Sequence, residues 1–123
     1  MSYNKLIQQH FFEPSGVLSK ADDVSDYRVI NEGSVALGDA LQFYVKMDEA
    51  HTTFEQLKFK AYGNPYVIAG MSYLCEQLQG KALSETEKFS AKHFIEIFEL
   101  PKTKYYVAYM LEDVLQELKK VML

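Results

Sequence analysis

This sequence of 123 residues contains no tryptophan and one cysteine, Cys75. One cysteine excludes an internal disulfide framework and any metal site built from several cysteines of the same chain. Basic residues are outnumbered by acidic ones, 13 against 17, and they are scattered along the chain. Because nucleic acid and anionic membranes both attract a dense basic face, this composition argues against either as a partner.

Long hydrophobic runs are absent as well. The N-terminal segment holds no apolar run long enough for a signal peptide, and no segment reaches the length of a membrane span. We therefore expect a cytoplasmic protein. With 48% hydrophobic and 24% charged residues, the composition is that of a globular protein. We expect residues 1–123 to form a single domain with a substantial core.

Three stretches alternate between apolar and polar side chains, which predicts β-strands: residues 27–32, 40–47 and 57–62. In the third of them, Leu57, Phe59 and Ala61 share one face, as expected of a strand that is buried on one side. Residues 36–39 are predicted to form a turn and residues 48–53 a hairpin connection. Three successive strands with short links favour an antiparallel meander.

The remaining apolar residues recur at helical spacing. Helices are predicted over residues 4–12, from residue 65 to a stop at Gly80, over 90–98 and over 103–122. Asn64 is a suitable N-cap for the second, with Pro65 at its first position. Ser84 and Glu87 match a capping box, which predicts a further short helix. The fold class is therefore α+β: a small three-stranded antiparallel sheet with helices packed on one face and a long C-terminal helix.

Three local motifs follow one another along the chain: residues 36–39 (Ala-Leu-Gly-Asp), 59–64 (Phe-Lys-Ala-Tyr-Gly-Asn) and 99–107 (Glu-Leu-Pro-Lys-Thr-Lys-Tyr-Tyr-Val). They resemble the Ala-Cys-Gly-Asp, Phe-Lys-x-Tyr-Gly-Cys and Glu-Leu-Pro-Pro-Val-Lys-x-His-Cys segments of the NifU/IscU-type iron–sulfur cluster assembly scaffolds (NifU N-terminal-like domain). The segment from Tyr3 to Pro14 also resembles the opening of that family. The resemblance implies a SufE/IscU-like fold, in agreement with the periodicity.

The ligand positions of the family are where this chain departs from it. The resemblance places the three cluster-binding cysteines at Leu37, Asn64 and Val107, and the ligand histidine at Tyr106. Only the loop aspartate, Asp39, matches. Iron–sulfur clusters and sulfur transfer both depend on thiolates, and one carboxylate cannot hold a cluster or a tetrahedral zinc ion. We therefore expect a divergent member that holds no cluster by itself and has no cofactor.

No other cysteine or histidine is expected to replace the missing ligands. Cys75 lies about 16 Å from Asn64 along the axis of the same predicted helix. It falls on the apolar stripe of that helix, so we interpret it as a small buried hydrophobic residue. His10, His51 and His93 fall on three different predicted elements, so we do not expect them to converge on a metal.

Asp39 and the tyrosines leave alternatives open. Asp39 is a vestigial ligand, a charge that repels anions or, as we favour, a residue that stabilises its turn. Five tyrosines are expected near the former site: Tyr62, Tyr66, Tyr105, Tyr106 and Tyr109. They suit an interface with a ligand or partner, but filling the emptied site by plain packing explains them equally well. No Ser/His/Asp set, phosphate loop or carboxylate pair is recognisable, so we expect no enzymatic activity.

The resemblance also implies partners. The Leu-Pro-Pro-Val-Lys loop of the family is recognised by an Hsp70-type chaperone, and Leu100, Pro101 and Lys104 match that loop. A cysteine desulfurase and a scaffold protein, which could supply thiolates around Asp39, are the other implied partners. The leading hypothesis is a non-catalytic interaction or regulatory module in iron–sulfur cluster assembly. The alternative is a binding protein outside that pathway, which uses a Tyr-rich surface for a small ligand or for a second copy of the chain.

Overall fold

The sheet has three antiparallel strands in the order β1-β2-β3: Arg28–Ser34, Asp39–Met47 and Phe54–Tyr62. The computed structural model describes residues 3–122. A short 3-10 turn, η1 (Val35–Leu37), joins β1 to β2 and ends at Gly38, whose φ of 99° favours glycine. The hairpin between β2 and β3 follows directly, so the predicted meander is confirmed.

Residues 3–122 contain four α-helices: α1 (Lys5–Phe12), α2 (Pro65–Leu78), α3 (Ala91–Ile97) and α4 (Tyr105–Met122). Asn4, Asn64 and Ser90 cap the first three helices, each accepting a hydrogen bond from a backbone N–H of the first turn. Two further 3-10 turns, η2 (Leu83–Lys88) and η3 (Lys102–Lys104), connect them. Within the described residues, no helix combines the length and the apolar character needed to cross a membrane.

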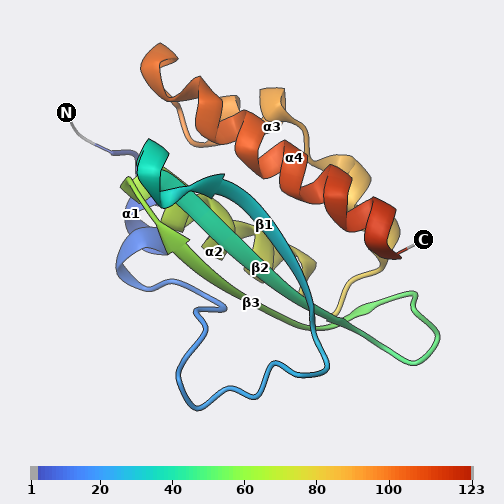
Figure 1. Ribbon diagram of the computed structural model, residues 1–123. Coiled ribbons are helices and arrows are strands. Elements are labelled where there is room, and N and C mark those ends of the chain that lie inside the picture. The colour runs from blue at the N-terminus through green and yellow to red at the C-terminus, as the bar shows by residue number, and fades with distance from the viewer. Residues whose placement is uncertain (1–2, 123) are drawn as a thin grey trace.

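One face of the sheet carries the core. Ile30, Phe43 and Phe59 are register partners across the three strands, and each is at most 4% exposed. Helix α2 packs against β3 and helix α4 against β1. In Figure 1, no helix lies in front of the three strands, and the opposite face of the sheet is open. The predicted fold class, with helices packed on one face and a long C-terminal helix, is confirmed.

Helix α2 is buried on more sides than its predicted stripe requires. It contacts α1, β3 and α4, which leaves little of its surface to solvent. Tyr66, Gly70 and Ser72 are therefore buried together with the predicted Met71 and Cys75. A helix that is buried on several sides has no fully polar face. Small residues then take the positions that charged residues take in a surface helix.

The predicted capping box at Ser84 is wrong. The segment forms the 3-10 turn η2, whose N-cap position is Ala82, with no side-chain capping hydrogen bond. Glu87 does not reach back to the start of the turn, because its carboxylate pairs with Lys119 of α4 at 3.0 Å. The Thr86 hydroxyl donates instead to a backbone carbonyl within the turn. A tertiary ion pair thus replaces the local contact that the motif predicts.

Candidate functional site

The three sequence motifs meet at one end of the molecule. Asp39 is the first residue of β2, Asn64 is the N-cap of α2, and Tyr106 lies in the first turn of α4. Asp39 and Tyr106 are separated by 67 positions in the sequence but are joined by a hydrogen bond. The fold therefore brings together the three polar residues among the five positions that the family resemblance marks.

These three side chains form a closed hydrogen-bond network. Asp39 Oδ1 accepts from the Asn64 backbone N–H at 3.0 Å and from Asn64 Nδ2 at 3.1 Å. The Tyr106 hydroxyl donates to Asp39 Oδ2 at 2.5 Å. Asn64 Nδ2 also donates to the Tyr106 hydroxyl oxygen at 2.9 Å. Both oxygens of the Asp39 carboxylate thus have donors from within the chain, and we refer to this set as the Asp39–Asn64–Tyr106 network.

Asn64 serves the network and its own helix at once. While its amide nitrogen contacts Asp39 and Tyr106, its side-chain oxygen accepts from the Tyr66 backbone N–H at 2.8 Å. That second bond caps α2. An asparagine can do both because its amide carries a donor and an acceptor on opposite sides. A cysteine at this position would offer neither hydrogen bond with comparable strength.

The network holds Tyr106 in its protonated form. Burial and the hydrogen bond donated to the Asp39 carboxylate raise the pKa of Tyr106 to about 12, against a smaller opposing effect of Asn64. The Lys104 ammonium lies 5.8 Å from the centre of the Tyr106 ring, in the range of a cation–π contact. The hydroxyl therefore remains a donor to Asp39 throughout the physiological pH range.

Gly63 allows the close approach of these elements. Its φ is 142°, a conformation that L side chains rarely adopt, and a Cβ built there would overlap Asp39 Oδ1. The position therefore requires glycine for its conformation and for its space. Sequence inspection placed Gly63 in a motif and in a turn, but its contact with the carboxylate follows only from the tertiary structure.

The other two former ligand positions point away from the network. Leu37, on η1, is 85% exposed, whereas Val107 is fully buried in the core. Cys75 is 3% exposed, and burial raises the pKa of its thiol to about 12, with Lys58 opposing the shift slightly. No described residue places a thiolate near Asp39, and the single cysteine lies on a buried side of α2.

Two of the three histidines lie closer together than expected. The rings of His10 and His93 both contact Tyr73, with ring centres 5.7 Å and 6.4 Å from it. His10 is buried, and its Nδ1 lies 2.7 Å from Ser72 Oγ. Burial lowers the pKa of His10, although the charge of Glu76 opposes this. In the part of the chain that the structure describes, no group of three His, Cys, Asp or Glu side chains could hold a metal ion.

The predicted tyrosine cluster divides into exposed and buried members. Tyr62, Tyr106 and Tyr109 are 56%, 41% and 54% exposed, and Tyr106 and Tyr109 share one side of α4. Tyr105 is partly buried. Tyr66 is only 3% exposed and packs its ring against the edge of Tyr3, so it is not part of the exposed surface.

Exposed aliphatic residues add to this end of the molecule. Val35 and Leu37 on η1 are 61% and 85% exposed. In the sequence, Leu37 stands out only as a position of the family motif, and Val35 belongs to no motif. The signal that could have found them is the pair of apolar residues inside a predicted turn, where polar residues are usual. Together with Tyr62, Tyr106 and Tyr109 they form what we call the exposed tyrosine surface.

The residues predicted to bind a chaperone are mostly buried or in contact with other residues of the chain. Leu100 is 6% exposed and belongs to the core, and Pro101 is partly buried. Lys104 lies over the Tyr106 ring. The exposed residues of this loop are Lys102 and Thr103, which are the two that depart from the family pattern. Recognition of Leu100 by a partner would require it to leave the core.

Comparisons with known proteins point to one family. A sequence model described as the NifU-like N terminal domain matches residues 2–120. The iron-sulfur cluster assembly scaffold protein IscU of Buchnera aphidicola (subsp. Schizaphis graminum) is 29% identical over 116 residues, covering 94% of this chain and 90% of the relative. The IscU scaffold protein of Escherichia coli is 27% identical over 116 residues, with coverage of 94% and 90%.

Solved structures show the same fold. A putative iron-sulfur cluster assembly scaffold protein for the SUF system from Fervidobacterium islandicum superimposes with a TM-score of 0.68 at 16% identity, covering 93% of each chain. The N-terminal part of a nitrogen-fixing NifU-like protein from Brucella abortus gives a TM-score of 0.58 at 14% identity, covering 97% of this chain and 81% of that one. At these identities the likeness concerns the fold alone.

Proposed function

This chain belongs to the NifU-like N-terminal domain family, and we propose that it is a scaffold-like protein of iron–sulfur cluster assembly that holds no cluster by itself. In this proposal it acts as a non-catalytic interaction or regulatory module of the pathway. The observation that carries the proposal is the Asp39–Asn64–Tyr106 network, which stands where the family resemblance places the ligands.

The residues at the site do not fit an iron–sulfur cluster. A cluster requires thiolates, and the positions expected to supply them hold Leu37, Asn64 and Val107. Leucine and valine have no donor atom, and the Asn64 amide is already used in three hydrogen bonds. The Asp39 carboxylate is satisfied by internal donors, so a metal would have to displace them.

The network also links three segments of the chain, as residues that bind one common metal centre would. It ties the turn before β2, the start of α2 and the start of α4 together. Hydrogen bonds to a charged carboxylate each contribute about 1.5–3 kcal/mol. This end of the fold is therefore stabilised without a cluster, which supports a function that does not depend on loading.

The exposed tyrosine surface is the part of this end that is available to a partner. Leu37 is 85% exposed and is the last residue of η1, two positions before Asp39. Tyrosine is enriched at the centres of protein interfaces, and the buried centre of an interface is more apolar than its rim. The family resemblance implies a cysteine desulfurase, a scaffold protein or an Hsp70-type chaperone as the partner, and the protein would regulate or adapt it without accepting sulfur.

Anaerobic reconstitution with iron and sulfide tests the proposal that the protein holds no cluster by itself. We expect the natural protein to develop no stable visible absorbance at stoichiometric iron. The combined substitutions Leu37→Cys, Asn64→Cys and Val107→Cys should restore cluster absorbance, because they return the thiolates to the positions that the resemblance assigns. A stable cluster on the natural protein that persists after Cys75→Ser would refute the proposal.

A tagged pull-down from native cell extract tests the proposal that the protein interacts with other proteins of the pathway. The recovered proteins are identified by mass spectrometry. We expect the natural protein to recover a desulfurase, a scaffold or its chaperone, and Leu37→Asp to lose that partner. Phe12→Asp is the matched control, because Phe12 is an equally apolar residue, 74% exposed, on a different element. If Leu37→Asp and Phe12→Asp recover the same partners, the exposed tyrosine surface is not the interface.

A second candidate function rests on the same exposed surface. Tyr62 and Tyr109 are more than half exposed, which suits a binding protein outside the pathway that takes up a small ligand or a second copy of the chain. Sedimentation velocity distinguishes the two functions. A concentration-dependent dimer that Tyr109→Ala dissociates, together with a pull-down free of pathway proteins, would favour this second function.

A further inference from the structure

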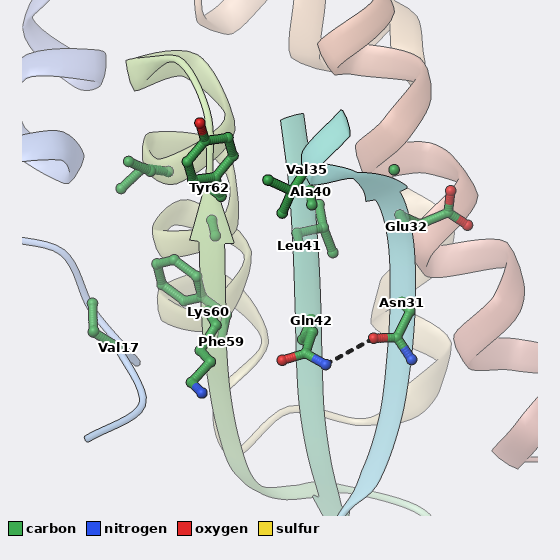
Figure 2. Close-up of a pocket in the computed structure, with 13 residues that line it drawn as sticks. Val17, Asn31, Glu32, Val35, Ala40, Leu41, Gln42, Phe59, Lys60 and Tyr62 are labelled. Carbon is green, nitrogen blue, oxygen red and sulfur yellow. Dashed lines mark hydrogen bonds between the residues drawn. The ribbon is translucent and has the colours of Figure 1, made fainter. Parts of the chain in front are cut away.

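The open face of the sheet contains a hollow of about 640 Å³. At its base Gly33 is the register partner of Ala40, and Ala40 is the register partner of Tyr62. Because the Ala40 side chain is a single methyl group, the surface is depressed there, whereas a Cβ at Gly33 would meet the Asp39 carbonyl oxygen and Met110. Tyr62 on β3 and Val35 on η1 lie beside Ala40 (Figure 2). The volume and the mainly apolar lining are those of a small-molecule site.

A polar row crosses the sheet next to this hollow. Asn31, Gln42 and Lys60 are register partners on β1, β2 and β3, so their side chains stand side by side on the open face. All three line the hollow, and Figure 2 shows the hydrogen bond between the first two. Gln42 Nε2 donates to Asn31 Oδ1 at 3.0 Å, and the Tyr44 hydroxyl donates to Gln42 Oε1 at 3.0 Å.

The row presents donors and a cation to a ligand. Both amide oxygens of Asn31 and Gln42 already accept a hydrogen bond. The Asn31 amide nitrogen and the Lys60 ammonium have no partner among residues 3–122, and both residues are exposed. Groups that can only donate are complementary to an anionic acceptor, and charge-assisted hydrogen bonds of this type are the strong ones.

The one carboxylate that lines the hollow does not face this row. Glu32 is the register partner of Leu41 and so belongs to the covered side of the sheet. Its side chain extends toward α4 (Figure 2), where the charges of Asp113 and Glu117 add to burial in raising its pKa. The open face beside Asn31 and Lys60 is therefore free of an opposing negative side chain within the hollow.

We propose that this hollow binds a small organic anion with an apolar body. The apolar part lies over Gly33 and Ala40, against Tyr62 and Val35. The anionic group, a carboxylate or another oxyanion, accepts hydrogen bonds from Asn31 and Lys60. The site shares no residue with the Asp39–Asn64–Tyr106 network, whereas Tyr62 and Val35 also belong to the exposed tyrosine surface. Lys60 lies outside that surface, so its substitution reports on the hollow alone.

Fluorescence titration with anilinonaphthalene sulfonate, an aromatic anion, tests the site on the natural protein. We expect saturable binding of one probe per chain, weakened about tenfold by Lys60→Gln because a charge-assisted contact is lost. The uncharged probe N-phenylnaphthylamine should bind with the same affinity before and after that substitution. Lys58→Gln is the matched control, since Lys58 stands on the same face of β3 but does not line the hollow.

A second variant and a second measurement locate the probe. Ala40→Leu fills the hollow and should abolish the binding of both probes, with near-ultraviolet circular dichroism confirming the fold. If that variant does not fold, the exposed Lys60→Gln still decides the outcome. Amide chemical-shift changes should centre on Gly33, Ala40 and Tyr62.

Two results would overturn the proposal. The first is equal affinity of the sulfonate for the natural protein and for Lys60→Gln, or shift changes centred elsewhere, such as on Leu37 and Tyr109. The second is self-association in sedimentation velocity that buries the hollow, which would assign the open face to a second copy of the chain.

Discussion

Two polar regions lie close together at the same end of the sheet, and they use their hydrogen bonds in opposite ways. In the Asp39–Asn64–Tyr106 network, the carboxylate, the amide and the hydroxyl all bond to one another. In the row of Asn31, Gln42 and Lys60, both amide oxygens accept internal hydrogen bonds, whereas the Asn31 amide nitrogen and the Lys60 ammonium have no partner among residues 3–122. The first region is complete without a ligand, whereas the second is complementary to an anion. A site is available to a ligand only where the fold leaves polar groups unsatisfied.

The largest effect on stability is expected at Gly63, which the closed network requires. Gly63→Ala should lower the free energy of unfolding by about 3 kcal/mol, because backbone strain adds to the displacement of Asp39. Gly80→Ala is the control, since Gly80 also has a positive φ, 76°, but open space around it. It should lose only about 1 kcal/mol. Urea unfolding measures both, and equal losses would mean that the network contributes nothing.

A smaller effect is expected at Tyr106, whose hydroxyl closes the network. Tyr106→Phe should lower the free energy of unfolding by about 1–2 kcal/mol, because Asp39 Oδ2 loses its donor. Tyr109→Phe, on the same side of α4 and 54% exposed, should leave stability unchanged. Urea unfolding at neutral pH is again the measurement, and an unchanged midpoint for Tyr106→Phe would contradict the role given to its hydroxyl.

The pKa of Tyr106 also predicts a dependence of stability on pH. The pKa is raised to about 12 in the folded state, above an unfolded value of 10. The folded protein therefore holds this proton more tightly, so its contribution to stability is complete below pH 10 and is lost as the pH rises from about 10 to about 12. Burial also raises the pKa values of Tyr66 and Tyr73, so absorbance titration of tyrosinate should show one late-ionising group fewer in Tyr106→Phe than in the natural protein.

The smallest effect on stability is expected in the row of Asn31, Gln42 and Lys60. Asn31→Asp keeps an oxygen to accept from Gln42 but replaces the free amide nitrogen by a charged oxygen. Stability should change by less than about 0.5 kcal/mol, because Asn31 is exposed. Binding of an anionic probe should nevertheless be lost. If Asn31→Asp strongly lowered stability but left probe binding unchanged, the row would serve to stabilise the fold and not to bind a ligand, which would contradict the comparison.

The sequence by itself determined the secondary structure and the fold class. Alternation of Leu57, Phe59 and Ala61 predicted β3, and Asn64 followed by Pro65 predicted the start of α2, because these signals depend on neighbours within a few residues. The three motifs also identified Asp39, Asn64 and Tyr106 one by one. Each of these inferences concerns a local property of the chain, which the order of the residues contains.

The tertiary structure decided which of these residues touch. Tyr106 bonds to Asp39 across 67 positions, Glu87 leaves its own turn to pair with Lys119, and Tyr66 turns inward against Tyr3. Strand register places Ala40 between Gly33 and Tyr62 at the hollow. Contacts between distant segments depend on how helices and strands pack, and no local pattern contains that information. For this reason the positions that the motifs mark could be predicted from the sequence, whereas the closed network and the hollow on the open face could not.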